Sequence, residues 1–208
     1  MKKLLIGSTL ACLLFVSANT INAEAAVSTH TVVSGDTLWK IAVKYEVGVK
    51  ELIQANPQIS NTNLIYPGMK VNIPADSPEE TFEKEVVRLV NVERAKNGLQ
   101  PLKENWELSR VARYKSMDMR DKGYFSHTSP TYGSPFDMMK QFGISYSYAG
   151  ENIAMGQRTP AEVVKGWMNS EGHRKNILSP NFTEIGVGYA VNSKGSTYWT
   201  QMFIKPRS

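Results

Sequence analysis

Residues 184–204, which read EIGVGYAVNSKGSTYWTQMFI, decide the fold class of the larger part of this 208-residue chain. Apolar residues alternate with other residues on both sides of the turn-like segment Asn192-Ser193-Lys194-Gly195. A period of two predicts strands, and two strands joined by a short turn predict an antiparallel hairpin. The alternating positions are Ile185, Val187, Tyr189 and Val191, then Tyr198, Thr200, Met202 and Ile204.

Helical patterns precede this hairpin. Ser77-Pro78-Glu79 is typical of a helix start, because serine is a common N-cap, proline suits the first position and acidic residues favour the first turn. Asn97-Gly98 is a typical helix end. Further helices are expected over residues 107–122, 136–141 and 159–169. Helices on both sides of an antiparallel sheet predict an α/β/α sandwich over residues 79–206, within a chain of the α+β class.

Residues 30–74 form a separate segment rich in turns, and a short polar linker, residues 75–78, follows it. The expected elements are a strand at 31–33, helices at 37–42 and 49–55, and a strand at 70–73. Asp36 is expected to be the N-cap of the first helix. The order strand, helix, helix, strand predicts a small βααβ module with a core of its own.

Composition and charge exclude several classes of protein. Hydrophobic residues make up 41% and charged residues 21% of the chain, as in ordinary globular proteins. The net charge of +5 is spread along the sequence and forms no dense basic stripe, so we expect no nucleic-acid partner. The single cysteine, Cys12, excludes disulfide scaffolds, CxxC redox motifs, cysteine-ligated zinc and iron–sulfur clusters.

The first 25 residues are typical of a secretory signal peptide. Two lysines follow Met1, residues 4–16 are almost wholly apolar, and Ala23-Glu24-Ala25 is typical of a cleavage site. The apolar run is shorter than the ~20 residues that span a bilayer. We expect cleavage after Ala25, with Ala26 as the alternative. No later segment is long and apolar enough for a membrane anchor, so the sequence predicts a secreted protein.

Four motifs in residues 30–74 together resemble a LysM module. They are HTVVSGDTLWKIA at 30–42, QANP at 54–57, LIYPGMKV at 64–71 and Ile73-Pro74. The resemblance implies binding to peptidoglycan or another glycan that contains N-acetylglucosamine, in a shallow groove between two loops. On this chain the loops supply Gly35, Asp36, Thr37, Leu38, Leu64, Ile65, Tyr66 and Pro67. His30 is expected on the surface, at the edge of the strand.

Motifs in the second segment resemble the CAP superfamily of cysteine-rich secretory, antigen-5 and pathogenesis-related proteins, in its disulfide-free bacterial YkwD-type branch. They are VNVERA at 90–95, FSHTSP at 125–130, GENIA at 150–154, WMNSEGHRKNIL at 167–178 and FTEIGVG at 182–188. The family gathers two histidines and two glutamates in a central cleft. His127, Glu151 and His173 match three of them, whereas Ser170 stands at the position of the second glutamate.

Three interpretations of His127, Glu151 and His173 stay open. The two imidazoles are candidate metal ligands, and with the carboxylate they suit a divalent cation such as zinc. The same trio suits acid–base catalysis without a metal. It also suits a buried polar network that only locks the cleft.

Together these patterns predict a secreted bacterial protein of the cell wall or spore surface that binds peptidoglycan through residues 30–74. The family context extends the expectation to cell-envelope or spore-coat assembly, with other envelope or coat proteins as partners. The first alternative is a metal-assisted hydrolase or peptidase centred on His127, Glu151 and His173. The second is a carrier of a lipid or another small molecule.

Overall fold

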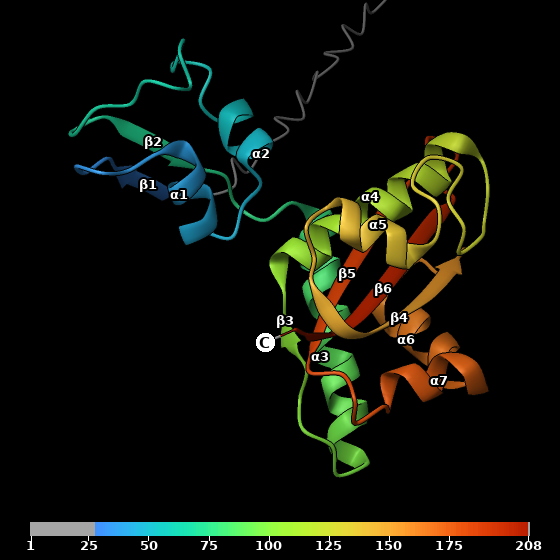
Figure 1. Ribbon diagram of the computed structural model, residues 1–208. Helices are drawn as coiled ribbons and strands as arrows, with labels where there is room; N and C mark the ends of the chain where they lie inside the picture. The colour runs from blue at the N-terminus through green and yellow to red at the C-terminus, as the bar shows by residue number, and fades with distance from the viewer. Residues whose placement is uncertain (1–27, 208) are drawn as a thin grey trace, which may run out of the picture.

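A computed structural model describes residues 28–207 and contains two groups of elements, each with its own sheet (Figure 1). The mixture of helices and strands confirms the predicted α+β class. Within the described residues, no helix is long and apolar enough to cross a membrane. The predicted signal peptide, its cleavage site and Cys12 lie outside the described residues.

The N-terminal unit, from β1 to β2, has the predicted βααβ order. Its elements are β1 (Ser28–Thr31), α1 (Leu38–Lys44), α2 (Val49–Gln54) and β2 (Lys70–Ile73). The two strands pair in antiparallel fashion, with His30 opposite Val71. The buried core consists of Val32, Leu38, Ile41, Ala42, Leu52, Ile59, Val71 and Ile73. A core of this kind stabilises the unit by burying apolar surface.

The start of α1 differs from the prediction, because Thr37 and not Asp36 is its N-cap. The Thr37 hydroxyl accepts a hydrogen bond from the Lys40 backbone N–H at 3.1 Å. The Asp36 carboxylate instead accepts one from the Val33 backbone N–H at 2.9 Å and so closes the turn before the helix. The strand also ends earlier than expected, at Thr31.

The expectation that His30 lies on the surface is wrong. Only 7% of the residue is exposed. Its Nε2 atom lies 2.8 Å from an Asp36 carboxylate oxygen, and its Nδ1 atom lies 3.1 Å from the Tyr45 hydroxyl. The hydrogen bond from His30 holds the pKa of Asp36 below its usual range. His30 is therefore a buried polar link between β1, the following turn and the end of α1.

The C-terminal unit, from α3 to β6, is the predicted α/β/α sandwich. Its sheet has the order β3-β5-β6-β4, formed by β3 (Lys103–Glu104), β4 (Tyr146–Met155), β5 (Glu184–Val191) and β6 (Thr197–Pro206). β3 runs parallel to β5, and the other neighbours are antiparallel. The helices are α3 (Pro78–Lys96), α4 (Trp106–Lys122), α5 (Pro135–Gln141), α6 (Pro160–Met168) and α7 (Glu171–Ile177).

The predicted hairpin of β5 and β6 forms the centre of this sheet. Ile185 and Val187 pack in one core with residues of α3, α6 and α7, including the fully buried Trp167. On the opposite face, Met202 and Ile204 pack in a second core with residues of α4 and α5. Helices therefore cover both faces of the sheet (Figure 1). For this reason every β6 residue from 197 to 204 is buried.

Helix α4 lies directly on β5 because that strand has glycine at two positions of the face it presents to the helix. A methyl group at Gly186 would overlap the backbone of Leu108 and Ser109, and one at Gly188 would overlap the backbone of Ala112 and Arg113. The Ser116 hydroxyl completes the contact by donating a hydrogen bond to the Gly188 carbonyl at 2.9 Å. The glycines therefore set the distance between α4 and the sheet.

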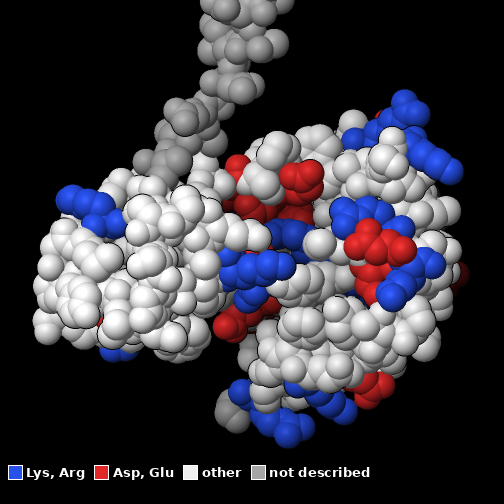
Figure 2. All heavy atoms as spheres, turned by 90° about the horizontal axis from the view of Figure 1, so that it is seen from above, with Lys and Arg blue, Asp and Glu red and all other residues white. Residues whose placement is uncertain are grey.

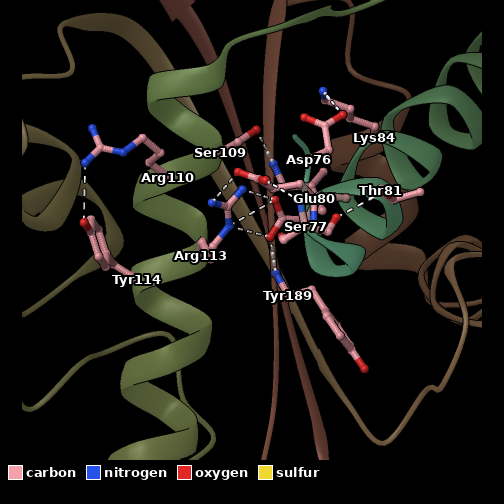
Figure 3. A network of polar contacts seen from close by, with 12 residues as sticks. Asp76, Ser77, Glu80, Thr81, Lys84, Ser109, Arg110, Arg113, Tyr114 and Tyr189 are labelled. Atoms are coloured by element: carbon pink, nitrogen blue, oxygen red, sulfur yellow. Dashed lines mark hydrogen bonds and ion pairs between the residues drawn. The ribbon is translucent and has the colours of Figure 1, made fainter. Parts of the chain in front are cut away.

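Side chains accept hydrogen bonds from backbone N–H groups at the outer edge of β5, beyond the two residues that pair with β3 (Figure 3). The Tyr189 N–H donates to the carboxylate of the buried Glu83 at 2.9 Å, and the Val187 N–H donates to the Ser109 hydroxyl at 3.2 Å. Arg113 pairs with Glu83 through Nε and Nη2. Burial raises the pKa of Glu83 to about 7, although the hydrogen bonds from Arg113 oppose that shift. This pair joins α3, α4 and the strand edge.

We predict that Gly188→Ala destabilises the C-terminal unit. The added methyl group overlaps backbone atoms of α4 and not a flexible side chain, so the helix must move. Overpacking of this kind costs about 3 kcal/mol. Chemical denaturation of the full chain, followed by circular dichroism, measures the loss.

The matched control is Gly166→Ala, in the exposed part of α6. No atom lies within 4 Å of a methyl group at Gly166. Alanine is a better helix former than glycine by roughly 1 kcal/mol, so this variant should equal or exceed the wild type in stability. Equal stability of the two variants would contradict the close approach of α4 to β5.

Candidate functional site

A hollow of about 290 Å³ opens on the N-terminal unit at the start of α1. Its walls come from that helix start, from α2 and from the loop before β2. The lining residues are Asp36, Thr37, Leu38, Trp39, Val49, Ile53, Thr62, Asn63 and Ile65. The volume is close to the lower end of ligand pockets, at ~300 Å³, and so suits a small group such as one sugar ring.

The chemistry of the hollow combines an apolar floor with polar edges. The side chains of Asp36 and Thr37 already accept hydrogen bonds from the Val33 and Lys40 backbone N–H groups. Trp39 stands in the first turn of α1 and is 63% exposed. An exposed indole beside a small hollow offers an apolar face and a polar N–H. The site therefore suits a ligand with one apolar face and several polar groups.

The structure brings four of the eight predicted glycan-binding residues to this hollow: Asp36, Thr37, Leu38 and Ile65. Gly35, Leu64, Tyr66 and Pro67 are not among its lining residues, and Leu64 and Tyr66 are strongly exposed. Sequence reasoning missed Trp39, Val49, Ile53, Thr62 and Asn63. Val49 and Ile53 reach the hollow from α2, which lies outside the two loop motifs. Trp39, Thr62 and Asn63 lie close to the predicted residues in the sequence.

In the C-terminal unit, His127 and Glu151 form a close pair. The His127 Nδ1 atom lies 2.6 Å from Glu151 Oε1. The His127 side chain is 54% exposed, whereas the Glu151 side chain is 2% exposed. β4 carries Glu151, and the loop between α4 and α5 carries His127. The pair therefore presents an accessible imidazole that a buried carboxylate holds from behind.

The two groups of this pair have shifted pKa values. The hydrogen bond to Glu151 raises the pKa of His127 above its ordinary value. Burial raises the pKa of Glu151, although the hydrogen bond from His127 opposes this shift. A charged imidazole donates from Nδ1 to the carboxylate, so its Nε2–H remains available to a ligand. This arrangement is typical of an oriented acid–base group.

Helix α7 carries the third predicted residue, His173, which is partly buried. Burial lowers the pKa of His173, and the nearby positive charge of His127 lowers it further. The buried Asn152 fixes the helix beside β4, because its Nδ2 donates to the His173 carbonyl at 3.2 Å. The Asn176 side chain in turn donates to Asn152 Oδ1 at 2.8 Å. These amides hold His173 near the His127–Glu151 pair.

The family's second glutamate has no counterpart at the start of α7. Ser170 is the N-cap residue of α7, and Glu171 is exposed in the first turn of that helix. In residues 28–207, no three histidine, cysteine, aspartate or glutamate side chains gather closely enough to hold a metal ion. His127 and Glu151 form a pair and not a three-ligand set in this arrangement, and a metal bound by His127 and His173 stays a prediction.

Two family profiles match the chain. The profile of the family described as "CAP: Cysteine-rich secretory protein family" matches residues 87–203. The LysM domain profile matches residues 30–74.

Individual proteins resemble different parts of the chain. The "Uncharacterized protein YkwD" of Bacillus subtilis is 63% identical over 137 residues, which are 65% of this chain and 52% of that protein. The chain thus spans about half the length of this relative. The "Spore coat assembly protein ExsA" of Bacillus cereus is 54% identical over 48 residues, 23% of this chain and 8% of that protein.

A solved structure shares the fold. It is the crystal structure of "an extracellular protein containing a SCP domain" from Bacillus anthracis. The match has a TM-score of 0.57 and 35% sequence identity, and it covers 67% of this chain and 47% of that one.

We predict that Glu151→Gln lowers the pKa of His127. The amide keeps the size of the side chain but removes the negative charge that favours the imidazolium, so the pKa should fall to about 6.5 or below. An NMR titration of the histidine ring protons in the full chain measures the shift. The backbone signals of the N-terminal unit are the internal control and should match those of the wild type. An unchanged His127 pKa would show that the pair does not exist in solution.

Proposed function

This chain belongs to the CAP family and carries a LysM domain, and from this premise we propose that it is an exported bacterial wall protein. In this proposal residues 1–25 direct export, residues 30–74 bind peptidoglycan, and residues 79–206 present the His127–Glu151 site at the wall. Residues 75–78 join the two parts. LysM domains suggest binding to peptidoglycan, and the hollow beside Trp39 supports this part of the proposal.

The hollow beside Trp39 is the observation that carries the proposal. N-Acetylglucosamine has an apolar ring face and an acetyl methyl group, together with hydroxyl and amide groups. Leu38, Ile53 and Ile65 give the hollow apolar contacts, whereas Thr62 and Asn63 give it hydrogen-bonding groups. Protein pockets commonly combine an apolar lining with a few placed polar groups in this way. A single small site binds weakly, so repeated glycan units at the wall supply the effective affinity.

The comparisons support a location at the cell wall or the spore surface. The ExsA match is 48 residues long, and the printed name of that protein refers to spore coat assembly. The Bacillus anthracis structure is described as extracellular. We therefore propose a role in cell-envelope or spore-coat assembly, in which the C-terminal unit meets a partner protein while the N-terminal unit holds the wall.

We predict that Trp39→Ala weakens binding of the full chain to purified sacculi. The indole is 63% exposed, so its removal should leave the fold intact while it removes an apolar face beside the hollow. Such a contact contributes about 1 kcal/mol, or a roughly fivefold change in the dissociation constant. Co-sedimentation at a series of sacculus concentrations measures the change.

Phe136→Ala is the matched control for that experiment, because Phe136 is an exposed aromatic residue on α5 with 42% exposure. This variant should bind as the wild type does. Equal binding by the Trp39 and Phe136 variants would contradict the proposal that the hollow is the glycan-binding site. A wild-type chain that stays in the supernatant would overturn peptidoglycan binding as a whole.

A second candidate function is hydrolysis at the wall, and the His127–Glu151 pair favours it. An exposed imidazole oriented by a buried carboxylate is competent to move a proton at a scissile bond. In this alternative the N-terminal unit delivers the pair to its substrate. His127 would be the acid–base group and Glu151 its orienting partner.

The test of the second candidate is the release of soluble fragments from sacculi. General acid–base catalysis contributes about 10²–10⁴-fold, so His127→Ala should abolish measurable release if the wild type shows it. Chromatography of the supernatant detects the fragments. A wild type that binds sacculi and releases nothing would leave the chain a binding protein.

A further inference from the structure

The most deeply buried charged group beside the His127–Glu151 pair is Lys115, on the sheet-facing side of α4. The residue has no exposed surface. Its neighbour Ser116 is equally buried and contacts Gly188 and Thr200 of the sheet. Transfer of an ammonium group out of water costs several kcal/mol unless hydrogen bonds and opposite charges compensate it. The contacts of Lys115 therefore indicate what the buried charge does.

Lys115 directs its hydrogen bonds to the loop that carries His127. The ammonium group donates to the His127 backbone carbonyl at 2.8 Å and to the Tyr124 hydroxyl at 3.2 Å. The Nζ atom also lies 5.0 Å from the centroid of the Tyr124 ring. These contacts fix the loop at residues 124 and 127. The carbonyl that Lys115 binds belongs to the same residue whose ring meets Glu151.

Burial lowers the pKa of Lys115, although the nearby carboxylates of Glu151 and Asp118 oppose that shift. Asp118 accepts hydrogen bonds from the hydroxyl groups of Tyr124, Ser129 and Thr131 at 2.6–2.7 Å. Glu151 binds His127 through Oε1, while its Oε2 is buried without a hydrogen-bond partner in residues 28–207. Lys115 thus supplies positive charge behind an incompletely satisfied carboxylate.

We propose that Lys115 is a positioning residue of the His127–Glu151 site. It holds the His127 backbone from inside the protein, so that the imidazole ring stays over Glu151 while its outer edge faces the ligand. Lys115 itself has no exposed surface and so touches no ligand. The proposal rests on the His127–Glu151 site and is independent of glycan binding by the N-terminal unit.

Removal of the Lys115 ammonium group changes the His127 pKa in opposite directions for a lysine that acts by charge alone and for one that positions His127. The direction of the change therefore tests the proposal. A nearby positive charge lowers the pKa of His127, so a lysine that acted by charge alone would leave a higher His127 pKa when removed. A lysine that positions His127 would instead release the loop when removed. The bond to Glu151 would then break, and the His127 pKa would fall.

The experiment is Lys115→Met in the full chain, which keeps a long flexible side chain and removes the ammonium group. The proposal predicts that the His127 pKa falls towards the ~6.5 of a free imidazole. Nitrogen chemical shifts should also show the loss of the fixed Nδ1–H form. An unchanged or raised His127 pKa would overturn the proposal. Sacculus binding should equal that of the wild type, which separates this result from a failure of the wall-binding function.

Lys122→Met is the matched control, since Lys122 is an exposed residue of the last turn of the same helix. It should leave the His127 titration unchanged. A second measurement needs no variant and so covers the case in which Lys115→Met fails to fold. In the wild type, the Lys115 ammonium protons should exchange slowly with water and show scalar coupling to the His127 carbonyl carbon. Rapid exchange without that coupling would overturn the proposal.

Discussion

The close approach of α4 to β5 at Gly186 and Gly188 is the constraint on which the C-terminal unit depends. With no side chains between them, the helix backbone touches the strand, and Ser116 reaches the Gly188 carbonyl. The same approach carries Lys115, which has no exposed surface, into the interior near Glu151 of β4. The buried polar contacts behind His127 therefore depend on the two glycines, and the loop that carries His127 is attached to a helix packed directly on the sheet.

Different interactions stabilise the two candidate sites. The hollow of the N-terminal unit is built on a small apolar core and on the His30–Asp36 pair, and its exposed Trp39 needs no network behind it. The His127–Glu151 pair depends on several buried polar contacts drawn from α4, β4 and α7. Figure 2 shows basic and acidic side chains side by side in the middle of the visible face and smaller basic groups at its periphery, in keeping with a modest net charge of +5. A modest net charge of this kind creates no strong field of one sign, so the proposed binding sites depend on local geometry.

Much of the fold was predictable because local signals coincide with it. The alternation in β5 and β6 and the helix start Ser77-Pro78-Glu79 mark their elements directly. The strand β4 gave no such signal, since YSYAGENIAM mixes small, polar and apolar residues without a period of two. Asp36 is expected from the sequence to be the N-cap of α1, but its carboxylate accepts a hydrogen bond from the Val33 backbone N–H, and Thr37 is the cap. The pairing of His127 with Glu151 came from family motifs. Lys115 carried no sequence signal, because only the tertiary approach of α4 buries it.

A spectral titration of the full chain with an N-acetylglucosamine tetramer tests the central claim most directly. In two-dimensional NMR spectra, the backbone signals of Thr37 and Ile65 and the indole N–H of Trp39 should shift together and saturate with one binding constant. The signals of β4 and α7 should stay in place. Saturable shifts confined to the C-terminal unit, or none at millimolar tetramer, would contradict the assignment of the hollow as the site that holds this protein to the wall.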